Sequence, residues 1–227
     1  MPLRKINISQ EVRRLTEPFS MIELAYINDF VMDVYICQGA IAWHRHVDQD
    51  ELFLVHSGVI TLDSEWGSVL LQPNELIVVP KGVGHRSSSF VWSVVLLFQP
   101  KFMPDRKNGD RRLFVPKEDN VLQKFNLDKE AARLIPPFST VDLAYIEDFV
   151  VRLVVCQGSF QWHRHKNQDE LLLVRKGEVF LESEEGDITL QEGELVVMPK
   201  SMMHRHTSIE RAEILLFERQ NLVLTGD

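Results

Sequence analysis

The sequence predicts an all-β protein made of two tandem β-barrels, and three observations support this prediction. The chain of 227 residues repeats itself, since residues 11–98 align with residues 130–217 without a gap and half of the aligned positions are identical. Each repeat consists of short segments rich in β-branched and large apolar residues, separated by turn-forming residues. A helical pattern is found only near residues 11–15, so the many short strands favour a sandwich or a barrel.

The length of the repeat sets the predicted domain organisation. The unit is longer than a solenoid repeat and long enough to bury a core of its own. We interpret it as an internal duplication that produced an N-terminal barrel over residues 1–98 and a C-terminal barrel over residues 120–227, joined by a linker over residues 99–119. The linker holds three prolines and several basic residues. A solvated loop is the favoured interpretation, and an anion site is the alternative.

The expected strands of the first repeat follow one another closely, and the second repeat has them at matching places. They cover residues 31–38, 51–58, 59–65, 68–72, 75–80 and 92–98. Turn-forming residues at 65–68 and 72–75 separate them. Asn74 corresponds to Gly193 in the second repeat, and this exchange fits a turn residue with a positive φ angle.

Composition excludes several function classes. Apolar residues make up 44% and charged residues 26% of the chain, as in an ordinary soluble globular protein. The net charge of -8 argues against a nucleic-acid partner. The sequence shows neither a signal peptide nor a run of roughly 18 apolar residues, so we expect a cytoplasmic protein with no membrane partner. Cys37 and Cys156 occupy matching places and are expected as core residues rather than as a disulfide.

A histidine-rich segment occurs once in each repeat. Residues 43–51 read WHRHVDQDE, and residues 162–170 read WHRHKNQDE. Alternate residues of a strand share a face, so His44 and His46 point the same way, whereas on a helix they would diverge. His85 follows where a later strand begins, and the second repeat has a histidine at the same place.

Each repeat therefore carries three imidazoles and one carboxylate that can converge. The sets are His44, His46, Glu51 and His85 in the first repeat, and His163, His165, Glu170 and His204 in the second. Six of the 8 histidines fall into these sets, which argues against scattered core or surface histidines. Mixed nitrogen and oxygen ligands suit divalent transition metals. We predict one such ion per barrel (Fe, Mn, Ni or Zn), with hydrogen bonding alone as the alternative.

The candidate catalytic residues are Glu51, Glu170 and His206. Either glutamate could act as a base if it is loosely held by the metal. His206 lies two residues after His204 and takes the place of Ser87, so it should share the face of the ligands. It is an extra ligand or a pocket base in one interpretation and a hydrogen-bonded structural histidine in the favoured one.

Taken in this order, the two sets resemble the motifs of the cupin superfamily, and the repeat resembles a two-domain bicupin built from small barrels. The first motif is matched by Gly39, His44, His46, Glu51 and Gly58, and by Gly158, His163, His165, Glu170 and Gly177. In both copies it is one residue shorter before the first histidine. The second motif is matched by Pro80, Gly82 and His85, and by Gly193, Pro199 and His204. Asn74, Ser201, Ser89 and Ser208 depart from it, which affects turns and strand ends and leaves the ligand positions intact.

The resemblance implies jelly-roll barrels with the metal held inside by the two sets of four residues. It implies no single reaction, because cupins include dioxygenases, decarboxylases, isomerases, lyases, sugar-binding regulators and storage proteins. We expect a metal-dependent enzyme, of the dioxygenase, isomerase or decarboxylase type, that acts on a small, partly apolar organic substrate. A non-catalytic bicupin that binds or senses a small ligand is the alternative, and a sugar-isomerase-like enzyme is the third hypothesis. A homodimer is left open.

The pockets should differ between the repeats. Met202 and Met203 replace Val83 and Gly84, so the second pocket should be narrower and more apolar. Inward acid–base groups beyond the four ligands would favour catalysis, whereas a barrel filled with side chains would favour a binding or structural role. No inward-facing lysine or arginine is identified.

The residues next to the ligand histidines should point away from the metal. Trp43 and Trp162 precede the ligands and are expected to pack in the core. The arginines that follow a ligand histidine should also lie on the opposite face: Arg45, Arg86, Arg164 and Arg205.

Overall fold

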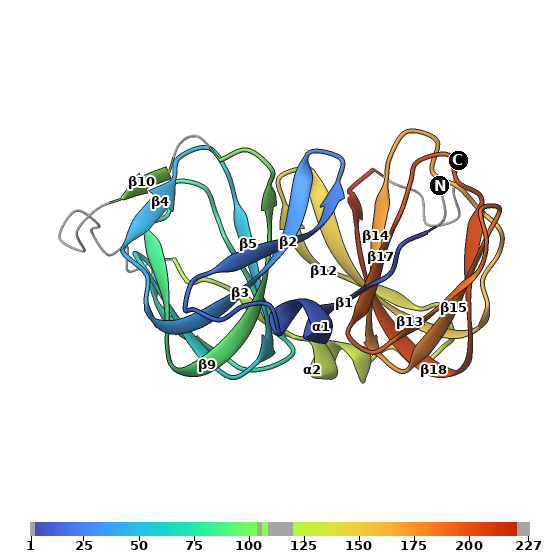
Figure 1. Cartoon of the computed structure of the whole chain (residues 1–227), viewed down its shortest axis with the longest axis horizontal. Helices are drawn as coiled ribbons and strands as arrows, with labels where there is room; N and C mark the ends of the chain where they lie inside the picture. Colours follow the sequence, from blue (N-terminus) through green and yellow to red (C-terminus); the bar gives the residue numbers. More distant parts are fainter. Residues whose placement is uncertain (1–2, 104–105, 109–119, 222–227) are drawn as a thin grey trace. The chain divides into compact units, whose positions relative to one another are not determined.

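The computed structural model describes residues 3–103, 106–108 and 120–221, and most of them lie in β-strands (Figure 1). The chain forms two compact units. The first barrel is Glu11–Leu127, and the second barrel combines Met1–Gln10 with Asp128–Asp227. In both, the strands curl around an apolar core, which confirms the predicted all-β fold of two jelly-roll barrels.

The first barrel is organised around one long strand. Its elements are α1 (Ile8–Val12, shared with the second barrel), β2 (Met21–Ile27), β3 (Phe30–Ala40), β4 (His44–His46), β5 (Glu51–Ser57), β6 (Ile60–Ser64), β7 (Gly67–Leu71), β8 (Glu75–Val79), β9 (His85–Pro100), β10 (Arg106–Asn108) and β11 (Lys124–Asn126). Strand β9 pairs with β3, β4, β5 and β6, all antiparallel. Strand β3 pairs along residues 88–100 of β9, while β6 and β5 pair with residues 85–88 and 94–98, so β9 joins the strands of the barrel into one sheet.

The second barrel repeats this organisation around β18. Its elements are β1 (Ile6–Asn7), α2 (Leu127–Ala131), β12 (Thr140–Ile146), β13 (Phe149–Ser159), β14 (Glu170–Lys176), β15 (Glu178–Ser183), β16 (Ile188–Gln191), β17 (Glu194–Met198) and β18 (His204–Arg219). Strand β18 pairs with β13, β14 and β15. The predicted positive φ angle recurs in the matching turns of the two barrels, 64° at Asn74 and 78° at Gly193, as the sequence exchange required.

Apolar side chains fill both barrels, as alternation along the strands predicts. Cys37 and Cys156 are both buried and do not form a disulfide, which confirms their prediction as core residues. None of the helices in the described part of the chain is both long and apolar enough to cross a membrane.

The short segments that precede the repeats are exchanged between the two units. Strand β1 comes first in the chain but pairs with β17 of the second barrel, and β11 precedes the second repeat but pairs with β8 of the first. Both are fastened in the same way. A lysine and an asparagine of each segment contact one buried glutamate, Lys5 and Asn7 with Glu194, and Lys124 and Asn126 with Glu75. The segments are therefore matched parts of the repeat.

The predicted linker contains strand residues at two places. Residues 99 and 100 complete β9, and residues 106–108 form β10, which pairs with the histidine-bearing strand β4. Residues 104–105 and 109–119 lie outside the described residues, so the domain boundaries at 98 and 120 stay a prediction. The basic residues of β10 are consequently placed beside the predicted ligands of the first barrel.

Candidate metal centres

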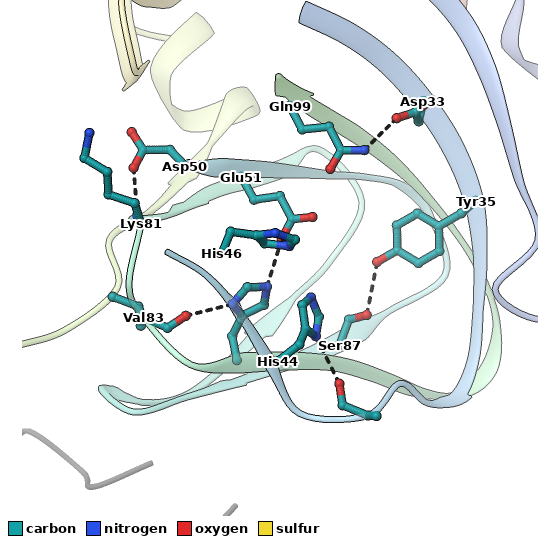
Figure 2. A network of polar contacts seen from close by, with 12 residues as sticks. Asp33, Tyr35, His44, His46, Asp50, Glu51, Lys81, Val83, Ser87 and Gln99 are labelled. Carbon is teal, nitrogen blue, oxygen red and sulfur yellow. Dashed lines mark hydrogen bonds and ion pairs between the residues drawn. The ribbon is translucent and has the colours of Figure 1, made fainter. Parts of the chain in front are cut away.

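The first barrel brings its four predicted ligands together from three strands. His44 and His46 alternate on β4, Glu51 begins β5 and His85 begins β9 (Figure 2). His44 pairs with His85 across the sheet, and their ring centroids are 4.4 Å apart. All four side chains are buried. The period-two spacing of the sequence thus produces a convergent group, as predicted.

Backbone carbonyls orient the imidazoles. The Nδ1 of His44 lies 3.0 Å from the carbonyl oxygen of Ala42, and the Nδ1 of His85 lies 3.0 Å from that of Val83. A proton on Nδ1 that is donated to the carbonyl leaves the Nε2 lone pair pointing toward the other ligands. Metal-binding histidines are commonly oriented in this way.

The second barrel reproduces the arrangement. His163 and His204 form a bridge between strands, with ring centroids 4.3 Å apart. Their Nδ1 atoms lie 3.1 Å and 3.0 Å from the carbonyl oxygens of Gln161 and Met202. His165 and Glu170 complete the group, which is buried throughout.

Both groups fit a metal ion. In each, one donor atom from every residue lies within 4.8 Å of the others. The Nδ1 atoms of His46 and His165 are buried and have no hydrogen-bond partner among the described residues, which is costly unless a ligand satisfies them. Their Nε2 atoms lie 3.5 Å from Glu51 and 2.9 Å from Glu170. Burial, with the nearby His85, lowers the pKa of His44 to about 4, so this imidazole is neutral and can ligate at neutral pH. Metal binding itself stays a prediction.

The carboxylate of the first centre is ionised. Burial acts to raise the pKa of Glu51, but the hydrogen bond with His85 and the nearby histidines outweigh it and lower the pKa to about 2. Its Oε2 lies 2.8 Å from the Nε2 of His85. Glutamate binds a divalent transition metal through its ionised carboxylate, so this state of Glu51 suits a metal site.

A cavity of about 730 Å³ adjoins the first centre. It is lined by His44, His46 and Glu51, by apolar residues such as Phe53 and Leu97, and by polar side chains that are not predicted ligands. Among the latter, the Tyr35 hydroxyl donates a hydrogen bond of 3.2 Å to Ser87 (Figure 2).

Asp33 is a further acidic residue of this cavity, which Glu51 and Glu23 also line, and the sequence offered no indication of its role. It lies on β3, and its Oδ2 accepts a 2.9 Å hydrogen bond from Gln99 Nε2 (Figure 2). Burial raises the pKa of Asp33 to about 6, only partly opposed by the hydrogen bond from Gln99. An inward acid–base group of this kind was the feature expected to favour catalysis.

Three basic residues contribute to the lining of the first cavity, but all three are exposed, so the expectation that no lysine or arginine faces inward stays a prediction. They are Arg14, Lys101 and Arg106. Arg106 lies on β10 opposite His46, and its positive charge acts to lower the pKa values of His44 and His46. A role for Arg106 at the first centre was not predicted, because this residue lies in the predicted linker. The only indication was the alternative that the basic residues of the linker form an anion site.

The second centre adjoins only about 20 Å³ of space. The ring of His206 stacks on Phe160 with centroids 5.0 Å apart and planes 8° from parallel, and Phe138 packs against both rings. These side chains occupy the volume that remains open in the first barrel, where Ile41 and Ser87 take the places of Phe160 and His206. The second pocket is narrower, as predicted.

The predicted cause of this narrowing is wrong. Met202 is buried, but neither it nor Met203 lines the second cavity. His206 lines that cavity, and both of its ring nitrogens are buried without a hydrogen-bond partner, which contradicts its interpretation as a hydrogen-bonded structural histidine.

The residues beside the ligands mostly point away from them, as expected. Arg45, Arg86 and Arg205 form ion pairs with Glu65, Asp63 and Glu182, and Arg164 is exposed. Trp43 is buried, as predicted, but Trp162 is 45% exposed and packs under the guanidinium of Arg205, so its prediction as a core residue is wrong.

Comparison with known proteins places these features in one superfamily. A cupin domain family model matches residues 149–218. The uncharacterized protein YdbB of Bacillus subtilis (strain 168) is 34% identical over 97 residues, which are 42% of this chain and 83% of YdbB. Most of the length of YdbB is therefore matched by less than half of the present chain.

Solved structures share the fold at low sequence identity. A cupin 2 conserved barrel domain protein from Leptotrichia buccalis has a TM-score of 0.68 at 11% identity, and 96% of each chain is covered. A salicylate 1,2-dioxygenase from Pseudaminobacter salicylatoxidans has a TM-score of 0.79 at 10% identity, with 96% of this chain and 84% of that chain covered. A structure of this dioxygenase with gentisate has a TM-score of 0.75 at 10% identity, with 96% and 81% covered.

Proposed function

Because this chain belongs to the cupin superfamily, and because its first barrel has an open cavity beside the predicted ligands, we propose that it is a metal-dependent enzyme with its active site in the first barrel. The observation that carries the proposal is the contrast between about 730 Å³ of space at the first centre and about 20 Å³ at the second. A catalytic metal site needs room for a substrate, whereas a structural one does not.

The lining of the first cavity supports a substrate class. Phe53 and Leu97 supply apolar surface, and Lys101 and Arg106 supply positive charge. Cations beside a partly apolar cavity attract a small organic anion and fix its charged end. We therefore narrow the expected substrate to a small organic acid with an apolar body.

The residues of the chain would share the work as follows. His44, His46, Glu51 and His85 would hold a divalent transition metal, with His44 and His85 oriented by their carbonyl contacts. When bound, such a metal supplies a Lewis acid, or an oxygen-binding centre if it is iron. The apolar lining excludes water, and Arg106 orients the carboxylate of the substrate.

Oxygen insertion is the first of the three reaction types to test. The supporting observation is the likeness in fold to the salicylate 1,2-dioxygenase, of which one structure contains gentisate. This likeness shows the fold alone, so isomerisation and decarboxylation of an organic acid remain part of the proposal.

A non-catalytic binding or sensing protein is the second candidate. For the second half of the chain the observations favour a non-catalytic role, but a structural rather than a ligand-binding one, because His206 and Phe160 leave no room for a ligand. We propose that the second centre holds a structural metal. The sugar-isomerase-like hypothesis has no specific observation in its favour.

The enzyme proposal is tested by screening aromatic and aliphatic carboxylic acids against protein loaded with Fe(II), Mn(II) or Ni(II). Dioxygen consumption and mass spectrometry of the products detect all three reaction types. We expect the intact protein to turn over a substrate, His44→Ala to lose this activity and His163→Ala to keep it. Turnover that persists in His44→Ala would place the chemistry elsewhere, and binding without turnover by any compound would favour the sensing candidate.

A further inference from the structure

We propose that Asp33 is a substrate-binding residue of the first barrel, where its free carboxylate oxygen accepts a hydrogen bond from a hydroxyl or ammonium group of the substrate. This inference rests on the proposed function, because it requires a small molecule in the first cavity. It adds a second recognition element to the anionic group proposed above.

The hydrogen bonding of Asp33 is incomplete. The residue is only 2% exposed, and its Oδ2 accepts the hydrogen bond from Gln99 Nε2. Its Oδ1 is buried and has no hydrogen-bond partner in the part of the chain that the structure describes. A buried carboxylate oxygen without a partner is costly, so such an atom beside a cavity indicates a donor that arrives from the cavity.

Asp33 lies beside the cavity that adjoins the first centre. Asp33 and Tyr35 alternate on β3, and both line the cavity that His44, His46 and Glu51 also line. Figure 2 shows Asp33 and Gln99 set apart from His44 and His46, with Glu51 between the two groups in this view. A molecule that reaches the metal ligands can therefore also reach Asp33.

The neighbouring charges keep Asp33 able to exchange a proton. Glu23 lies opposite it on β2 and Glu51 lies across the cavity, and both charges act, after burial, to raise its pKa to about 6. Gln99 lies on β9, the other strand beside β3, and the cations Lys101 and Arg106 line the same cavity. A carboxyl of this kind can accept either a hydrogen bond or a proton from a bound hydroxyl near neutral pH.

The second barrel has different residues at the positions of Asp33 and Gln99. Arg152 replaces Asp33 and Glu218 replaces Gln99. Arg152 donates to Asp142 at 2.5 Å and forms a buried ion pair with Glu218. Protein side chains alone therefore bind the arginine at this position, although Oε2 of Glu218 is buried and, among the described residues, has no hydrogen-bond partner. The two barrels differ in that only the first has an aspartate here, beside the larger cavity.

Together the two recognition elements define a substrate class of small hydroxy- or amino-substituted carboxylic acids. The test uses matched probes that differ at one group, namely the positional isomers of hydroxybenzoate and of hydroxybutanoate with their methoxy counterparts. Binding to the metal-loaded full chain is measured by calorimetry. For at least one isomer, the hydroxyl compound should bind about tenfold more tightly than its methoxy partner, as expected of a hydrogen bond to a charged group.

The decisive variant is Asp33→Asn, because it keeps the shape of the side chain. Gln99 can still donate to the Asn oxygen, which turns the Asn NH₂ group toward the cavity as a donor. The preference should then disappear or invert toward the methoxy probe, which a purely structural role of Asp33 would not produce. The control is Asp63→Asn, the same change at a residue that pairs with Arg86 outside the cavity, and it should keep the preference for the hydroxyl.

The outcomes separate this inference from the proposed function. Equal binding of hydroxyl and methoxy probes to the intact protein overturns the role of Asp33 and leaves the enzyme proposal standing. A hydroxyl preference that survives in Asp33→Asn also overturns it. Failure of every probe to bind overturns the substrate class, while the turnover screen still judges the enzyme proposal on its own.

Discussion

The two barrels carry the same types of candidate ligand in a similar arrangement but differ in the space beside them. The closest histidine rings are 4.4 Å apart in the first barrel and 4.3 Å apart in the second. The adjoining cavities are about 730 Å³ and 20 Å³. The donor set alone therefore does not define an active site. The barrels are distinguished by side chains that are not predicted ligands, namely Phe160 and His206 in the second barrel and Ile41 and Ser87 in the first.

The largest expected effect separates the two centres by their metal content. Protein purified without added metal should contain about two equivalents per chain, because both donor sets are complete. His44→Ala should remove one equivalent together with all turnover, and His163→Ala should remove the other and leave turnover in place. Elemental analysis and the turnover assay provide the measurements.

Two results would contradict this separation. Fewer than about half an equivalent in the intact protein would exclude paired metal sites. Loss of both metals from either single variant would show that the centres are coupled rather than independent.

An exchange of the filling side chains should exchange the properties of the barrels. Phe160→Ile with His206→Ser introduces the residues of the first barrel and should open the second centre to a small anion such as azide. Ile41→Phe with Ser87→His should close the first. We expect azide affinity to change by about tenfold or more in each case, which is about 1.4 kcal/mol.

Azide binding is best followed by the visible spectrum of the cobalt-substituted protein. His163→Ala in the exchanged background is the control, because the new azide signal should vanish with the second metal. Unchanged azide binding in both exchange variants would mean that access to the metals is controlled by other residues.

The ligands could be predicted from the sequence because their arrangement is local. The positions of His44 and His46 follow from strand alternation, and His85 follows from the start of the next long strand. The cavities could not be predicted in this way. Phe160 and His206 come from segments far apart in the chain, and their contact is decided by how the barrel closes.

Two further features were missed for similar reasons. Met202 and Met203 looked decisive because they lie next to a ligand, but neither lines the cavity. The lysines and asparagines that hold the short segments could have been predicted from the sequence, because Lys5 and Asn7 recur as Lys124 and Asn126 at the spacing of the repeat. That each segment joins the other barrel is a matter of tertiary pairing, which the repeat does not show.

A smaller effect should appear in the stability of the first barrel. The pKa of Asp33 is raised from 3.8 to about 6, by burial and then by the charges of Glu23 and Glu51. The folded protein thus binds this proton more tightly than the unfolded chain, and ionising Asp33 costs folding free energy as the pH rises from about 4 to about 6. A rise of this size corresponds to at most about 3 kcal/mol, because each pKa unit is worth about 1.4 kcal/mol.

Asp33→Asn should therefore stabilise the metal-free protein at pH 7 and have little effect near pH 4. Denaturant unfolding at a series of pH values measures the difference, with Asp63→Asn as the control that should show no such pH dependence. Equal effects of Asp33→Asn at pH 4 and pH 7 would contradict the raised pKa. Such a gain in stability would show that the aspartate is kept at a cost to the fold, as expected for a functional residue.

The smallest expected effect concerns the feature in which the barrels agree. Glu75 and Glu194 are buried, and each accepts hydrogen bonds from a lysine, an asparagine and a backbone N–H of its own turn. Glu75→Gln and Glu194→Gln should each lower the free energy of unfolding by about 1 kcal/mol, because the lysines are partly exposed and the charged contact is screened. Chemical denaturation measures both.

Near-equal losses would show that the fastening segments are equivalent although the pockets have diverged. A loss of unfolding free energy in only one of the two variants would mean that the barrels have diverged beyond the residues that line their cavities. The expected equality has a physical basis. The contacts of Glu75 and Glu194 lie at the sheet edge, away from the cavities, so they are unaffected when one cavity fills and the other stays open.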